Sequence, residues 1–265
     1  MNDARPTDTQ LIDRRLISRL GPVLSAGLPA GESRVHAEVL HQLCLADGLL
    51  ELLDWSRQGV GADPLACMWL SSLRWNRLIT GGFPEGAPQP PARALDTALL
   101  RLLRDGGLSI LEGTGETSLA GLASGEMAYP SSPAQPDEDD AAALIRVVPI
   151  GLVPYVEEEM RRSWVRQAVS LTQGDPELIS AAERLMALVH AAASGQLADP
   201  APALEEILRE AGAPPEAAEI LRRQLSACAA DEEIPCHEAD TGHETAPHPA
   251  VAAFAQEWER VTRPA

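Results

Sequence analysis

The stretch Asp140–Pro154 (DAAALIRVVPIGLVP) constrains the fold most, because it is the most apolar segment of an otherwise acidic chain. Apart from its first residue it carries one charge, Arg146, and a guanidinium that stays protonated is costly to bury without an acceptor. Its two prolines lack an N–H and clash with the preceding turn of a helix. The stretch therefore predicts a buried helix over Ala141–Ile145 that runs into an extended turn over Val147–Pro154, with Arg146 paired to a carboxylate.

Apolar residues recur at helical spacing along most of the chain, and no segment alternates as a half-buried strand does. Asp63-Pro64 and Asp175-Pro176 each combine a helix-capping side chain with proline at the first helical position. Gly21-Pro22 indicates the end of the first helix. Helices are predicted over residues 11–20, 33–55, 65–79, 92–104, 157–172, 176–194, 203–211, 215–227 and 250–261, so the fold class is all-α.

The segments between these helices differ in character. Residues 113–125 are small and polar enough to line a pocket, and residues 129–140 are expected to form an exposed loop. Length and composition favour one main helical domain. It is predicted over residues 31–228, with a variable segment 1–30, a polar segment 229–249 and a C-terminal helix 250–265.

Charge and hydropathy exclude several classes of partner. The 265 residues include 39 acidic and 21 basic side chains, the latter all arginine, for a net charge of −18. Because phosphate binding needs a basic face, nucleic acid is excluded, whereas a basic protein partner would suit this charge. No apolar run approaches the roughly 20 residues of a membrane span, and the N-terminus has no signal-peptide pattern. We therefore expect a cytoplasmic protein with no membrane partner.

Metal-ligating residues are present but not in a metal-binding pattern. His36 and His41 are five residues apart, which places them on different faces of a helix. The polar tail fits no standard zinc spacing, and the four scattered cysteines are expected to be free thiols, with Cys44 and Cys67 on predicted helices. The cysteines and histidines in and beside this tail, residues 229–249, are Cys228, Cys236, His237, His243 and His248.

The chain has no nucleophile elbow and no phosphate-binding glycine loop. The acidic run Asp137–Asp140 could bind a cation, but such runs usually form a solvated loop or a helix start. The chemistry of the residues alone therefore indicates no active site.

Four stretches nevertheless resemble the ADP-ribosylglycohydrolase family, in the order in which that family carries them. The third, IRVVPIGLVP, is similar to the family's methionine-arginine-x-x-proline-x-glycine-leucine signature. The fourth, AVSLTQGDPELISAA, is similar to the helix junction where members carry threonine-histidine-glycine. The four stretches are Ala46–Trp75, Gly115–Gly125, Ile145–Pro154 and Ala168–Ala182. The resemblance implies an orthogonal multi-helix bundle, and an enzyme that uses two Mg²⁺ ions to hydrolyse ADP-ribose from modified side chains.

The metal motifs implied by this resemblance are missing. The family's threonine-aspartate-aspartate-threonine motif falls on His36–Val39, where Glu38 is the one remaining carboxylate. The aspartate-rich motif expected near the C-terminus has no counterpart after residue 195, and the N-terminal glycine-aspartate-alanine-leucine-glycine segment is also absent. Because one carboxylate cannot hold two hard divalent cations, no metal is expected unless the site is rebuilt from other residues.

The ligand cleft implied by the resemblance is also altered. The family's glycine-rich loop falls on Glu138–Ala142, so carboxylates stand where backbone would approach a pyrophosphate. The junction histidine is Gln173, and the asparagine of another family segment is Glu116. The ligand-cleft residues expected from the comparison are Thr117, Asp139, Asp140, Arg146 and Gln173.

Three hypotheses follow. The first is a pseudoenzyme that binds an unknown protein or small ligand in the old cleft without a cofactor. The second is an enzyme with metal-independent chemistry, in which Glu38 and Glu116, or Glu112, act as acid and base. The third is an active ADP-ribosyl hydrolase whose Mg²⁺ site is rebuilt, for example from Asp137, Asp139 and Asp140.

Overall fold

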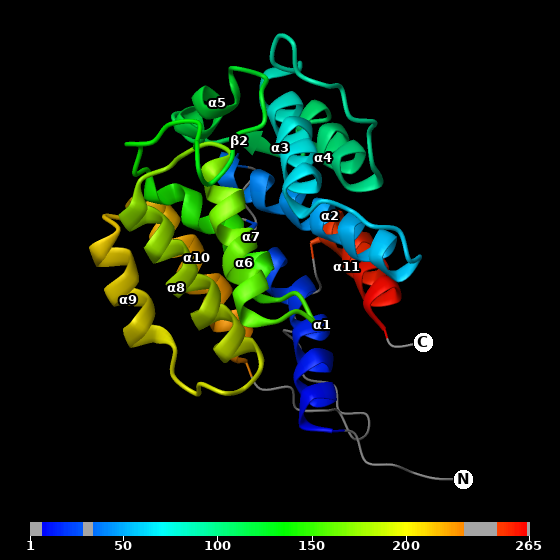
Figure 1. Ribbon diagram of the computed structural model, residues 1–265, viewed down its shortest axis with the longest axis vertical. Helices are drawn as coiled ribbons and strands as arrows, with labels where there is room; N and C mark the ends of the chain where they lie inside the picture. The colour runs from blue at the N-terminus through cyan, green and yellow to red at the C-terminus, as the bar shows by residue number, and fades with distance from the viewer. Residues whose placement is uncertain (1–6, 29–33, 231–247, 264–265) are drawn as a thin grey trace.

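The structure, a computed structural model, describes residues 7–28, 34–230 and 248–263. These residues form eleven α-helices with almost no strand, so the all-α prediction is confirmed (Figure 1). None of the described helices has both the length and the apolar character needed to cross a bilayer. The helices are α1 (Asp8–Gly27), α2 (Ala37–Arg57), α3 (Pro64–Thr80), α4 (Ala94–Arg104), α5 (Glu116–Leu122), α6 (Leu144–Gly151), α7 (Glu158–Ser170), α8 (Pro176–Ala193), α9 (Ala201–Glu210), α10 (Pro215–Ala229) and α11 (Pro249–Thr262).

Helix α2 is the centre of the fold. All of its residues from Ala37 to Leu50 are buried, because α3, α4, α6 and α11 pack around it. Gly48 permits a close contact with α3, since a Cβ there would lie 2.9 Å from the Ser71 side chain. A helix that is covered on all sides in this way must supply internal partners for its charged groups.

Helix α1 passes through Gly21-Pro22, so the predicted end of the first helix at that dipeptide was wrong. Pro22 removes one backbone hydrogen bond, but α1 packs against both α10 and α11. A Cβ on Gly21 would lie 3.0 Å from the Cβ of Ala255 on α11. Glycine therefore serves here as a point of close helix contact, which the sequence pattern did not distinguish from a stop.

The apolar stretch also continues as a helix through a proline. After a short 3₁₀ turn at Ala141–Ala143, α6 runs to Gly151 with Pro149 inside it, so the predicted extended turn after Arg146 was wrong. Pro149 has no N–H to offer the carbonyl of Ile145, four residues earlier. Gln42 on α2 donates its Nε2–H to that carbonyl at 2.6 Å. The central helix thus satisfies the carbonyl that the proline leaves unpaired.

The capping signals and the remaining helices follow the predictions closely. Asp63 accepts from the N–H of Leu65, and Asp175 accepts from the N–H groups of Glu177 and Leu178. The segment predicted to line a pocket contains α5. The described residues also hold one short strand pair, in which β1 (Arg34–Val35) and β2 (Ser109–Ile110) pair in parallel over two residues each. Two residues are too few to show the alternation that marks a strand in a sequence.

Candidate functional site

Six polar side chains from four parts of the fold meet in the core, and we call them the buried polar cluster. They come from α2, α5, α6 and the turn after α7. None of them is more than 1% exposed, so their polar groups depend on partners within the protein. Glu38 Oε2 and Arg146 Nε make no hydrogen bond and instead face each other as an ion pair. The members are Glu38, His41, Ser118, Arg146, Thr172 and Gln173.

Glu38 and Arg146 form the charged centre of this cluster. Glu38 Oε2 lies 3.7 Å from Arg146 Nε, and Ser118 donates its hydroxyl to Glu38 Oε1. Burial alone would raise the pKa of Glu38, but chiefly the positive charge of Arg146, with the hydrogen bond from Ser118, lowers it to about 2. Glu38 is therefore ionised at neutral pH, and it supplies the carboxylate, not identified in the sequence, with which Arg146 was predicted to pair.

His41 is held as a neutral ring. It stacks on Trp75 with ring centroids 4.1 Å apart, and its Nε2 lies 2.9 Å from the Ser72 hydroxyl. Because Ser72 donates its own proton to the Met68 carbonyl, it accepts one from His41 Nε2. His41 Nδ1 is then free to accept from Arg146 Nη1 at 3.4 Å. Burial and the positive charge of Arg146 lower the pKa of His41, which keeps the ring neutral.

Ser72, His41 and Glu38 stand in the order of a hydroxyl–imidazole–carboxylate triad, with His41 Nδ1 3.4 Å from Glu38 Oε2. Ser72 and His41 are both fully buried, however, and the Ser72 proton is bonded to a backbone carbonyl. A nucleophile must reach its substrate, and this hydroxyl cannot reach one from outside the protein. In this conformation the triad-like order is a structural contact, because the neutral His41 ring carries its proton on Nε2 and has none on Nδ1 to give Glu38.

Gln173 joins the cluster to the loop before α6. Arg146 Nη2 donates to Gln173 Oε1, and Thr172 Oγ1 donates to the same oxygen at 2.6 Å. The amide of Gln173 in turn donates to the backbone carbonyl of Asp140 at 3.3 Å. The residue that stands in place of the family's junction histidine is thus a link between the arginine and the altered loop.

The loop over residues 129–140, expected to be exposed, is tied to the protein at its centre. Half-buried Gln135 donates to the carbonyls of Thr117 at 2.9 Å and Thr172 at 2.6 Å. Gly174 permits this close approach, because a Cβ there would lie 2.4 Å from Pro133. The loop therefore covers the α5 side of the cluster, while its acidic residues at 137–139 stay exposed as predicted.

The residues present do not fit a dinuclear magnesium site. Glu38 Oε1 is occupied by Ser118, and Oε2 faces the guanidinium of Arg146, which would repel a cation. Within the described parts of the chain, no three His, Cys, Asp or Glu side chains are grouped to hold a metal ion. His36 is used otherwise, since its Nδ1 accepts from the N–H of Glu38 and caps α2.

The other predicted site residues lie outside the cluster. Glu116 is the first residue of α5 and is exposed, as is Glu112, whereas Glu38 is buried. Glu116 and Glu38 therefore do not lie in one dry pocket. The predicted acid–base pair would need such a pocket to hold the pKa values of its two carboxylates apart. Thr117 is half-buried and bonded through its carbonyl, and Asp140 caps the 3₁₀ turn by accepting from the N–H of Ala142.

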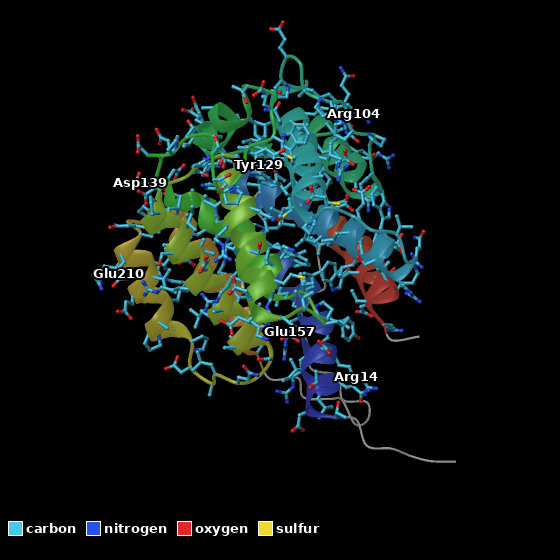
Figure 2. All side chains as sticks on the ribbon, viewed as in Figure 1. Arg14, Arg104, Tyr129, Asp139, Glu157 and Glu210 are labelled. Carbon is cyan, nitrogen blue, oxygen red and sulfur yellow. The ribbon has the colours of Figure 1, made fainter. Side chains whose placement is uncertain are left out.

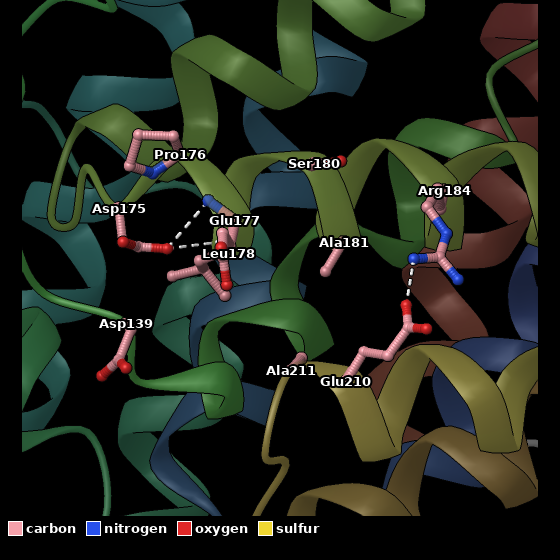
Figure 3. Close-up of a pocket in the computed structure, with 10 residues that line it drawn as sticks. All are labelled: Asp139, Asp175, Pro176, Glu177, Leu178, Ser180, Ala181, Arg184, Glu210 and Ala211. Atoms are coloured by element: carbon pink, nitrogen blue, oxygen red, sulfur yellow. Dashed lines mark hydrogen bonds and ion pairs between the residues drawn. The ribbon is translucent and has the colours of Figure 1, made fainter.

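Asp139 lines a cavity of about 470 Å³ between the end of this loop, α8 and α9, which we call the acidic cavity (Figure 3). Asp139 and Asp175 lie toward one end, and Arg184 pairs with Glu210 at the other at 2.5 Å. Asp139 and Glu210 both reach the surface on the same side of the molecule (Figure 2). The sequence does not indicate this cavity, because nothing in its pattern shows that α9 lies beside α8. Its charged lining residues are Asp139, Asp175, Glu177, Arg184 and Glu210.

Most of the cysteine and histidine tail, including Cys236, His237 and His243, lies outside the described residues. His248 is described, and its N–H donates to the Ser25 hydroxyl at 3.3 Å. The described cysteines, Cys44, Cys67 and Cys228, are buried free thiols as predicted. Burial raises the pKa of Cys228 to about 12, so this thiol is not a reactive nucleophile.

Comparison with known proteins agrees with the fold and with the resemblance seen in the sequence. The sequence profile described as ADP-ribosylglycohydrolase matches residues 6–262, which is nearly the whole chain. Searches of curated proteins and of solved structures gave no match. The match extends from the start of α1 to the end of α11, and the chain therefore belongs to the ADP-ribosylglycohydrolase family.

Proposed function

We propose that this member of the family is a pseudoenzyme, which does not hydrolyse ADP-ribosyl groups and instead binds a partner. One observation carries the proposal: Glu38, the carboxylate left in the first metal motif, is ionised, buried and neutralised from within by Arg146. Mg²⁺ needs several oxygen ligands in a fixed arrangement. Here the guanidinium and a serine hydroxyl already occupy the surroundings of the carboxylate.

The acidic cavity supports the second half of the proposal. It adjoins the buried polar cluster, since Asp139 is next to Asp140, whose carbonyl accepts from Gln173. Its lining holds four carboxylates and one guanidinium, and the whole chain carries a net charge of −18. Such a site attracts cationic groups and repels a pyrophosphate. The partner is therefore a cationic ligand or a protein that presents a basic side chain.

The first test is hydrolysis of ADP-ribosylarginine by the purified full chain, with Mg²⁺ and separately with a chelator. The proposal expects no ADP-ribose release in either condition. It also expects that ADP-ribose and Mg²⁺ together leave the melting temperature unchanged. Release that depends on Mg²⁺ would overturn the proposal in favour of a rebuilt metal site at Asp137, Asp139 and Asp140.

Release in the presence of the chelator would instead favour the metal-independent enzyme. In that case Glu116→Gln should abolish turnover, because Glu116 is the exposed member of the predicted acid–base pair. The matched control is Glu126→Gln, which changes another exposed glutamate beyond the end of α5. Loss of turnover in both variants would argue against a specific role for Glu116.

A positive test of binding uses polyarginine and polyglutamate as probes of opposite charge. The proposal expects polyarginine to bind and polyglutamate not to bind. Binding of polyarginine should weaken when Asp139 and Asp175 are both changed to asparagine. It should not weaken when Glu85 and Glu126, exposed acidic residues that line neither cavity, are both changed to glutamine. The cytoplasmic location, the lack of a nucleic-acid partner and the domain boundaries stay predictions from the sequence.

A further inference from the structure

A second cavity, of about 480 Å³, lies between helices that are far apart in the sequence, and we call it the inter-helix cavity. It is formed by α2, α4 and α11, whereas the acidic cavity is formed by α8, α9 and the loop before α6. Figure 1 shows where these helices lie in the fold. Its wall is mostly apolar, which favours burial of an apolar group. The apolar lining residues are Leu50, Ala94, Leu95, Ala98, Ala253 and Phe254.

One carboxylate in this apolar lining is incompletely paired. Asp47, on the buried helix α2, is 5% exposed and lines the cavity. One of its oxygens accepts from Arg93 Nε at 2.5 Å, and the other has no hydrogen-bond partner within the described part of the chain. Burial raises the pKa of Asp47, although Arg93 opposes this. The free oxygen is not among the fully buried unpaired atoms, so it is open to a donor that enters the cavity, and an ionised carboxylate is a strong acceptor.

The other charges of the lining do not supply that donor. Arg93 directs its Nε to Asp47, and its Nη1 lies 3.5 Å from Glu51, so its guanidinium is shared between two carboxylates. The third charged residue of the lining, Glu257, is negative and pairs with Arg260 at 2.6 Å. The lining itself thus carries two carboxylates against one guanidinium, and an entering cation would be favoured over an anion.

We propose that the inter-helix cavity binds a small ligand that has an apolar body and a protonated amine. The ammonium donates to the free oxygen of Asp47, and the apolar body packs against Leu95 and Phe254. A charge-assisted hydrogen bond at a desolvated carboxylate gives the amine its advantage over a neutral ligand of the same shape. The site shares no lining residue with the acidic cavity, so it stands whether or not the family's reaction is lost.

The test is calorimetric titration of the full chain with three probes of similar shape, which are 2-phenylethylamine, 2-phenylethanol and phenylacetate. The expected result is that the amine binds at least about tenfold more tightly than the alcohol, as a hydrogen bond to a charged group implies. Phenylacetate should not bind. Equal affinity for the three probes, or no binding of the amine at millimolar concentration, would overturn the proposal.

Two variants separate the carboxylate from the cavity. Asp47→Asn should weaken the amine at least about tenfold and leave the alcohol nearly unchanged. Ala98→Leu should remove binding of both by filling the cavity while Asp47 and Arg93 stay in place. Ala201→Leu, at an exposed position of α9, is the matched control and should bind as the unchanged protein does. If Asp47→Asn does not fold, the Ala98→Leu variant tests the proposal by itself. Amine binding that survives in Ala98→Leu would show that the amine does not bind in this cavity.

Discussion

The buried polar cluster and the acidic cavity each contain a glutamate–arginine ion pair, one shielded from solvent and the other open to it. In the cluster, Glu38 and Arg146 are 1% and 0% exposed, and every partner comes from the protein. In the cavity, Arg184 and Glu210 are 42% and 41% exposed, and water surrounds the pair. Their 2.5 Å separation is shorter than the 3.7 Å of the buried pair. Distance alone therefore does not rank their importance to the fold.

The difference shows how this scaffold divides its charges between structure and binding. A buried ion must keep its partner, because neither charge can return to water without unfolding. A solvated pair is screened and can exchange its partner for a ligand. The cluster is thus suited to hold α2, α5, α6 and the junction together, and the acidic cavity is suited to meet a partner.

The largest effect is expected when the buried cation is removed. Arg146→Met should destabilise the protein by about 3–5 kcal/mol, because it leaves Glu38 ionised in the core without a counter-charge. Urea denaturation followed by circular dichroism measures this. Adding Glu38→Gln to Arg146→Met should restore part of the lost free energy of unfolding. A loss of less than about 1 kcal/mol in Arg146→Met alone would show that the buried pair is no more important to stability than the exposed one.

The next effect concerns pH. The pKa of Glu38 is lowered to about 2, against an ordinary glutamate value of about 4.3, so this carboxylate contributes stability above pH ~4.3. That contribution, at most about 3 kcal/mol, is lost as the pH falls through this window toward about 2. The free-energy gap between the unchanged protein and Glu38→Gln should therefore narrow on acidification. A gap that stays constant from pH 7 to pH 3 would show that Glu38 is not the group responsible.

A smaller effect is expected at the proline inside α6. Gln42→Leu leaves the Ile145 carbonyl without its donor and also breaks the amide pair with Gln224, at an expected cost of about 1–3 kcal/mol. Adding Pro149→Ala supplies a backbone N–H for the same carbonyl. The double variant should be more stable than the sum of the two single changes predicts. Simple additivity would show that Gln42 does not act through this carbonyl.

No measurable effect on stability is expected in the acidic cavity. Arg184→Gln breaks the exposed pair with Glu210, and the solvated carboxylate left behind needs no new partner. The urea midpoint should match that of the unchanged protein within the reproducibility of the measurement. A clear shift of the midpoint would place this pair with the structural charges rather than the binding ones.

The sequence anticipated much of the fold because its signals are local. Helical spacing of apolar residues located nine of the described helices, and Asp63-Pro64 and Asp175-Pro176 marked two helix starts at the right residues. The two internal prolines were misread as helix ends. In both cases the compensation comes from another helix, through Ala255 packed against Gly21 and through the Gln42 amide. The sequence pattern around each proline cannot show which residue of another helix will pack against it or replace its lost hydrogen bond.

For the candidate site, too, local features could be read from the sequence, whereas the contacts between helices could not. The sequence by itself determined that Arg146 needs a buried carboxylate, that Glu38 alone remains of the first metal motif, and that the chain is acidic. Only the tertiary structure decided that Glu38 is the carboxylate in question, with Ser118 and His41 around it. It also brought Asp139 beside α8 and α9, and Asp47 beside α11. The physical reason is that residue chemistry states what a buried charge requires, while the packing of distant helices selects which group meets that requirement.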